Sequence, residues 1–163
     1  MGPGGAVFEK FLASLPTLTR LAGEPVLTAG LKTDLLLILQ KGAVVVLKDS
    51  IEIARVNQPG AVLGELSALL DQPHAAEVRA LEDSQFYVAD AALLEKDTSA
   101  LLYVAKILAQ RLLDADRGLV ELKKALDASQ SAGVLGKTVE RIQNMLRVGG
   151  ALHGYPIDGS RIL

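Results

Sequence analysis

Residues 59–80 read PGAVLGELSALLDQPHAAEVRA, and this stretch decides the expected fold. Two short apolar runs, Ala61–Leu63 and Ala76–Leu81, stand on either side of a segment that opens with Gly64 and Glu65. Gly64 lacks a Cβ and lets the backbone approach another group closely, and the apolar residues after Glu65 fit one helical turn. The stretch therefore predicts a strand, a one-turn helix and a second strand in close succession.

Short runs of β-forming residues continue on both sides of this stretch, between residues 17 and 88. The runs are Thr17–Ala22, Val26–Thr28, Leu35–Gln40, Ala43–Lys48, Ile51–Asn57, Ala61–Leu63, Ala76–Leu81 and Gln85–Val88. The turn residues between them are Gly23, Gly30, Gly42, Asp49–Ser50, Pro59–Gly60 and Gln72–Pro73. Asp49–Ser50 predicts a tight hairpin, although it lacks the Gly that such turns favour. Runs at this spacing predict an antiparallel sandwich or barrel.

Helical periodicity marks both ends of the chain. The expected helices are Ala6–Ser14, which Pro16 ends, Asp90–Lys96, a long helix from Thr98 or Ser99 to about Leu126, and Lys137–Val148 after a break at Gly133 and Gly136. We therefore expect an α+β fold: a jelly-roll-like antiparallel β-roll of about eight strands, with a short N-terminal helix and a long C-terminal helix. Residues 6–128 form this domain, and residues 129–163 add a short amphipathic helix and a flexible tail.

The long helix carries a heptad pattern. Apolar residues alternate spacings of four and three without a slip, at Leu101, Ala105, Leu108, Leu112, Ala115, Leu119, Leu122 and Leu126. We call these eight residues the seam. A helix that packs on its own β-domain normally shows a wider and less regular apolar face. The seam therefore favours an intermolecular coiled coil and a homodimer, with packing on its own domain as the alternative.

Composition excludes several classes of function. The chain has 163 residues, no Cys and two His that lie far apart, so disulfides, thiolate metal sites, His-based metal sites and catalytic triads have little to build on. A net charge of −2 and the lack of a basic face argue against nucleic acid as a partner. The sequence holds no apolar run of membrane-spanning length and does not open with a signal peptide, so a cytoplasmic protein is expected.

Three segments in order resemble the cyclic-nucleotide-binding domain family, the sensor domain of catabolite-activator-type regulators, kinase regulatory subunits and gated channels. Residues 21–30 (LAGEPVLTAG) look like the opening strand pair and its glycine turn, and the Gly30–Gly42 interval is the one that the family uses. Residues 59–80 look like the phosphate-binding cassette, G-x-h-h-G-E-h-A/S-L followed by P-R-S/T-A-x-V-x-A. The resemblance covers residues 6 to about 126 and implies a β-roll that senses a ligand and is not an enzyme.

The resemblance also implies the ligand-contacting residues, which are Val62, Leu63, Gly64, Glu65, Leu66, Ser67, His74, Ala75, Ala76 and Asp116. Glu65 takes the role of accepting from the ribose 2′-hydroxyl, and the helix after Gly64 presents backbone N–H groups to an anion. The long helix can face the nucleobase of either protomer, which makes Asp116 a candidate base contact.

The cassette departs from the family at two positions. Where the family has the Arg that pairs with the cyclic phosphate, this chain has His74, and where it has Ser or Thr, this chain has Ala75. His is charged only below a pKa of about 6.5, and losing a charge-assisted hydrogen bond costs on the order of 1.5–3 kcal/mol. Arg79 compensates only if its strand faces the right way. The ligand therefore stays open between a cyclic nucleotide, another anion and none.

The sequence thus predicts a non-catalytic, homodimeric module that binds cAMP or cGMP and relays binding through its long helix. The alternative is a degenerate β-roll that has lost its ligand and acts as a dimerisation or scaffold module. Residues 127–163 are too few for the helix-turn-helix domain of catabolite-activator-type regulators, so we expect a stand-alone sensor, a fragment of a larger protein, or a subunit that contacts a protein partner through its tail.

Overall fold

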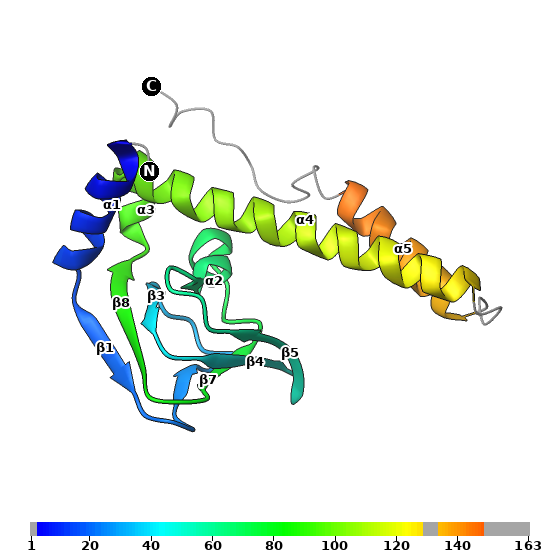
Figure 1. Cartoon of the computed structure of the whole chain (residues 1–163), viewed down its shortest axis with the longest axis horizontal. Coiled ribbons are helices and arrows are strands. Elements are labelled where there is room, and N and C mark those ends of the chain that lie inside the picture. The colour runs from blue at the N-terminus through cyan, green and yellow to red at the C-terminus, as the bar shows by residue number, and fades with distance from the viewer. Residues whose placement is uncertain (1–2, 129–133, 149–163) are drawn as a thin grey trace. The chain divides into compact units, whose positions relative to one another are not determined.

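The computed structural model describes residues 3–128 and 134–148 (Figure 1). The helices are α1 (Pro3–Ser14), α2 (Glu65–Leu70), α3 (Ala92–Lys96), α4 (Thr98–Ala128) and α5 (Val134–Val148). The strands are β1 (Thr17–Arg20), β2 (Pro25–Leu27), β3 (Leu35–Lys41), β4 (Val44–Lys48), β5 (Ile51–Val56), β6 (Val62–Leu63), β7 (Glu77–Ala80) and β8 (Ser84–Asp90). The predicted fold class is confirmed, with eight strands, a short N-terminal helix and a long helix after the strands.

The strands form two four-stranded antiparallel sheets. One sheet has the order β1-β8-β3-β6 and the other the order β2-β7-β4-β5. Leu39 and Phe86 of the first sheet share a buried core cluster with Val44 and Val78 of the second, so the core lies between the sheets. Most of this core is aliphatic, and its largest fully buried side chain is Phe86.

Strand β3 explains why a run as apolar as LLLILQ does not alternate. Leu37 and Leu39 face the second sheet, while Leu36 and Ile38 join a separate cluster on the opposite face. That second cluster includes Leu94 of α3 and residues from the start of α4. A strand that is covered on both faces reads as a continuous apolar run.

The predicted hairpin at Asp49–Ser50 is confirmed. Lys48 pairs with Ile51 across a two-residue loop, and both loop residues have positive φ, at 51° and 65°. Two positive φ values define the turn whose twist suits a hairpin, and here two non-Gly residues adopt it.

The prediction that Gly136 breaks the chain is wrong, because α5 begins at Val134 and continues through Gly136. A Gly in the first helical turn is tolerated, since the N–H groups of that turn have no partner within the helix. Gly133 and the predicted tail Gly149–Leu163 lie outside the described residues.

The chain falls into two compact units with their boundary between Leu108 and Ala109, inside α4. The first unit holds the β-roll and the beginning of α4. The second holds the remainder of α4 with α5, where Leu126 and Val139 are buried. The predicted division at residue 128 stays a prediction. Among the described helices, none combines the length and apolarity needed to cross a bilayer.

Candidate functional site

A closed loop of residues 64–76, which we call the cassette loop, connects β6 to β7. Val62 and Leu63 anchor its start in the core. Gly64 has φ +87°, and a Cβ at this position would lie 2.8 Å from the carbonyl oxygen of Leu35. Both the backbone conformation and the space therefore require Gly, and Gly64 leads directly into α2.

The turn of the cassette loop is closed by its own polar groups. The Ser67 hydroxyl donates to the carbonyl oxygen of Gln72 at 2.5 Å, and the Gln72 N–H donates to the Ser67 carbonyl oxygen at 3.2 Å. Glu65 and Ser67 are both 3% exposed, whereas Leu66 is 51% exposed. Ser67 thus serves the loop itself, and Leu66 offers an apolar surface.

His74 fastens the cassette loop to residues 28–34, which join β2 to β3. Its N–H donates to the Leu31 carbonyl oxygen and its own carbonyl oxygen accepts from the Gly30 N–H, each at 2.9 Å. Its ring nitrogen Nε2 lies 2.8 Å from Thr33 Oγ1. The ring also lies near the start of the loop, since Cε1 is 3.6 Å from the place where a Gly64 Cβ would stand. The imidazole therefore fills the space between the two loops.

Burial decides the charge of His74. The side chain is 6% exposed, and desolvation lowers the pKa of the imidazole below its ordinary value, with the nearby Glu65 charge opposing this in part. The ring is therefore neutral at neutral pH. At the Arg position a His can carry a charge for the phosphate or can pack as a neutral ring. In this structure His74 is packed and hydrogen-bonded.

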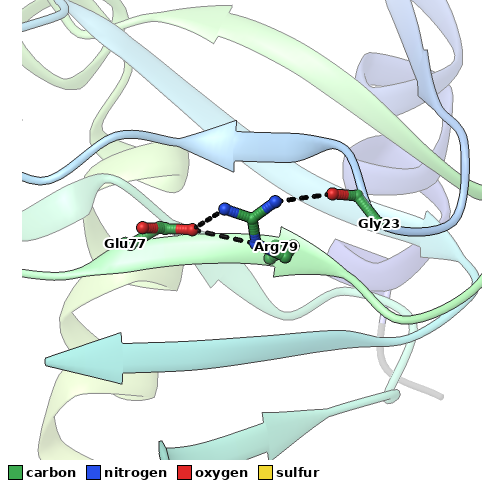
Figure 2. Close-up of polar contacts among 3 residues, drawn as sticks. All are labelled: Gly23, Glu77 and Arg79. Carbon is green, nitrogen blue, oxygen red and sulfur yellow. Dashed lines mark hydrogen bonds and ion pairs between the residues drawn. The ribbon is translucent and has the colours of Figure 1, made fainter. Parts of the chain in front are cut away.

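Arg79 lies on the exposed face of β7. Val78 and Ala80 are buried and Arg79 is exposed, as alternation along β7 requires. Figure 2 shows its guanidinium held by Glu77, with Nε 2.9 Å from Oε1, and by the carbonyl oxygen of Gly23, 2.8 Å from Nη1. Arg79 therefore does not replace the missing Arg of the cassette.

Lys32 is a cation that the sequence analysis missed. It lies between Leu31 and Thr33, both of which bond to His74, and its ammonium forms an ion pair with the Asp71 carboxylate at the end of α2. The hydrogen bond with Asp71 is the main reason why the pKa of Lys32 is raised. No local motif marks Lys32 or Thr33, because each contacts a residue about forty positions away.

Most predicted ligand-contacting residues lie together in β6 and the cassette loop. Ala75 is exposed and Ala76 partly buried. Asp116 is exposed and belongs to the second unit, so its predicted contact with the base stays a prediction. The described residues contain no cluster of His, Asp or Glu that could hold a metal ion.

A hydrogen bond joins α4 to the strand that leads into the cassette loop. The Tyr103 hydroxyl donates to the carbonyl oxygen of Gly60 at 2.7 Å, two residues before β6. Gly60 has φ +90°, and a Cβ there would lie 2.7 Å from the Tyr103 hydroxyl. Burial raises the pKa of Tyr103, which keeps the phenol protonated as a donor. No spacing in the sequence marks Tyr103 as a functional residue.

Comparison with known protein families and structures identifies the family of this domain. Residues 19–96 match the family model of the cyclic nucleotide-binding domain. No curated protein sequence matches the chain.

Solved structures share the fold. A cyclic nucleotide-binding domain from Methylobacillus flagellatus KT is 25% identical with a TM-score of 0.61, over 67% of this chain and 68% of that one. The catabolite activator protein of Thermus thermophilus is 20% identical with a TM-score of 0.62, over 96% of this chain and 88% of that one. The cAMP-bound PfPKA-R structure is 27% identical with a TM-score of 0.55, over 66% of this chain.

This chain spans 37% of the PfPKA-R structure, so the activity of that whole protein is not transferred with the fold. All three similar segments lie within the matched range, and the two sheets form the β-roll that the resemblance implies. Residues 19–96 of this chain therefore belong to the cyclic nucleotide-binding domain family.

Proposed function

We propose that this protein is a non-catalytic regulatory module that binds a cyclic nucleotide, cAMP or cGMP, at the cassette loop. The observation that carries the proposal is that the two ends of that loop come close together on the family's β-roll, with His74 Cε1 3.6 Å from the place where a Gly64 Cβ would stand. The solved PfPKA-R structure, which is 27% identical, is bound to cAMP. The proposal assigns the phosphate to the Gly64–Glu65 end of the loop and the ribose 2′-hydroxyl to the Glu65 carboxylate.

Calorimetric titration with cAMP, cGMP and 5′-AMP tests this function. We expect saturable binding of at least one cyclic nucleotide and much weaker binding of 5′-AMP, whose open phosphate and free 3′-hydroxyl differ from the cyclic ring. Glu65→Gln should weaken the binding about tenfold, because it removes a charged acceptor of the ribose hydroxyl. Glu82→Gln, at an exposed site outside the cassette loop, is the matched control and should bind as the wild type does.

We also propose that α4 relays binding through a homodimer. The Tyr103 hydrogen bond ties α4 to the residues that lead into β6, so a shift of the cassette loop has a direct route to the helix. Five seam residues are exposed in the single chain: Leu101, Ala105, Leu112, Ala115 and Leu122. Leu108 and Leu119 are partly buried, and Leu126 is buried. An exposed apolar row on a 31-residue helix supports a coiled-coil contact.

Sedimentation distinguishes this dimer from a monomer. Leu108 packs against the β-roll cluster, so the sharper variant is Leu112→Asp with Leu122→Asp, at two seam positions that are about half exposed. This double variant should be monomeric at tens of micromolar, whereas the wild type sediments as a dimer. Leu113→Asp with Val120→Asp, equally exposed and off the seam, should stay dimeric. A monomeric wild type would contradict the proposal.

A second candidate function is a dimerisation or scaffold module that binds no nucleotide. The neutral, buried His74 and the outward Arg79 favour it, because both leave the loop without the expected cation. The same titration distinguishes the two functions, since a scaffold gives no heat with any nucleotide. The cytoplasmic location and a protein partner for the predicted tail stay predictions.

A further inference from the structure

An anionic ligand at the cassette loop needs a cation within reach. His74 is neutral and bonded to Thr33, and Arg79 is held by Glu77 and Gly23 on the outer side of β7. A phosphate that is bound by backbone N–H groups alone has no cation beside it, so no positively charged side chain balances its charge.

Lys32 lies beside the cassette loop on the chain segment that is bonded to it. Leu31 accepts from the His74 N–H, and Thr33 contacts the His74 ring, so the backbone of Lys32 runs along His74. The same ring lies near Gly64, where the phosphate is proposed to bind, since its Cε1 is 3.6 Å from the place where a Gly64 Cβ would stand. Lys32 therefore belongs to the segment that the backbone and ring of His74 hold against the cassette loop.

The partner of Lys32 is an anion of the cassette loop itself. Asp71 has φ 53° at the end of α2, and its side chain is 79% exposed against 43% for Lys32. A solvated ion pair of this kind contributes little to stability, commonly 0–1 kcal/mol, so it is easily exchanged. A Lys side chain has a flexible four-carbon stem that can carry its charge from one anion to another.

We propose that Lys32 is the cation that pairs with the phosphate of the ligand, and that Asp71 holds the Lys32 ammonium until the phosphate displaces it. This assignment rests on the proposed function. It makes Lys32 the residue that distinguishes a nucleotide from the neutral nucleoside, because only the nucleotide carries the charge that competes with Asp71.

Titration of three variants with cAMP, cGMP and adenosine tests the assignment. Lys32→Gln should weaken cyclic-nucleotide binding about tenfold or more, as expected for the loss of one charge-assisted contact, and leave adenosine binding unchanged. Asp71→Asn should tighten cyclic-nucleotide binding severalfold, because the competing anion is gone. Adenosine binding that is unchanged in Lys32→Gln shows that this variant is folded, and the gain in Asp71→Asn is a second readout that misfolding cannot produce. Lys48→Gln, the same change of charge at an exposed lysine of β4, should bind as the wild type does.

The outcomes separate the assignment from the proposed function. If Lys32→Gln binds the cyclic nucleotide as tightly as the wild type does, or if Lys32→Gln and Lys48→Gln lose the same affinity, the role of Lys32 is overturned. The cyclic-nucleotide function still stands in either case. Asp71→Asn binding no more tightly than the wild type would overturn the competition. A wild type that binds neither cAMP nor cGMP would overturn the function and the assignment with it.

Discussion

The core between the two sheets and the cassette loop bury residues for different reasons. The core cluster is apolar throughout and contains Leu39, Val44 and Phe86, each with no exposed surface. In the described part of the chain, four polar or charged residues are buried, and three of them, Glu65, Ser67 and His74, lie in the cassette loop. Burial of polar groups is unfavourable unless each finds a partner. The contrast locates the functional region, since the loop keeps polar groups where apolar ones would pack more simply.

Removing the largest core side chain should produce the largest loss of stability. Phe86→Ala leaves a cavity at the centre of the β-roll and should lower the free energy of unfolding by about 3–5 kcal/mol. Urea unfolding followed by circular dichroism measures this loss. Gln85→Ala, at the neighbouring and partly buried position of β8, is the control and should cost less than about 1 kcal/mol. Similar losses in both variants would show that Phe86 is not central to the core.

Gly64 links the two regions, and its replacement should have the next largest effect. Gly64→Ala places a Cβ 2.8 Å from the Leu35 carbonyl oxygen at a φ of +87°. The strain should lower the free energy of unfolding by about 1–3 kcal/mol and disturb the cassette loop. Gly23→Ala, at a similar positive φ with nothing within 4 Å of its Cβ, separates the clash from the backbone strain. Equal losses in the two variants would contradict a close approach at Gly64.

His74 should make stability depend on pH within a narrow window. Because burial lowers the pKa of the folded imidazole, the unfolded chain binds the proton more readily, and stability rises with pH between the lowered pKa and the unfolded value near 6.5. This contribution is complete above pH 6.5 and is lost as the pH falls through the folded pKa. His74→Gln cannot titrate, so its stability deficit relative to the wild type should shrink from pH 7.5 to pH 5.0 in urea unfolding.

The control for this pH dependence is Ala75→Ser, at the exposed neighbour of His74. It adds no titrating group and should keep the pH dependence of the wild type. A deficit of His74→Gln that grows on acidification would contradict a buried neutral imidazole, because it would mean that the folded state favours the charged ring.

The smallest effect is expected at the β4–β5 hairpin, away from both regions. Ser50 has φ 65°, a conformation that Gly adopts without steric cost. Ser50→Gly should therefore raise the free energy of unfolding by about 0.5–1 kcal/mol. Asp49→Asn, at the other residue of the turn, is the conservative comparison. It should change the free energy of unfolding by less than about 0.5 kcal/mol. A loss of stability in Ser50→Gly would show that the Ser side chain stabilises the turn.

The strands and helices could be predicted because their signals are local. The turn residues around Asp49–Ser50 and Pro59–Gly60 bracket strands that the structure places within one or two residues of the prediction. The direction of Arg79 is left open by the sequence, and the structure decides it, because Val78 and Ala80 on either side are buried and Arg79 is exposed. The failure at Gly136 is local too, since a Gly is a poorer breaker in the first turn of a helix than in its interior.

The polar contacts of the site could not be predicted in the same way. Thr33 with His74, Lys32 with Asp71 and Tyr103 with Gly60 each join residues about forty positions apart. Such pairs depend on how the β2–β3 connection and α4 pack against the loop, and no spacing within either segment encodes that. The family resemblance identifies the position of His74 in the cassette. Only the burial of the side chain in the structure shows that the imidazole is neutral and not charged.

Nucleotide binding at the cassette loop is tested most directly by a map of backbone amide shifts in a ¹H–¹⁵N spectrum as cAMP or cGMP is added. We expect saturable shifts concentrated in the cassette loop, Gly64–Ala76, and in residues 30–33, with adenosine giving a weaker response at residues 30–33 than either cyclic nucleotide. The β4–β5 hairpin should stay unchanged. Shifts that are absent with both cyclic nucleotides, or that saturate only outside the cassette loop, would contradict nucleotide binding at this site.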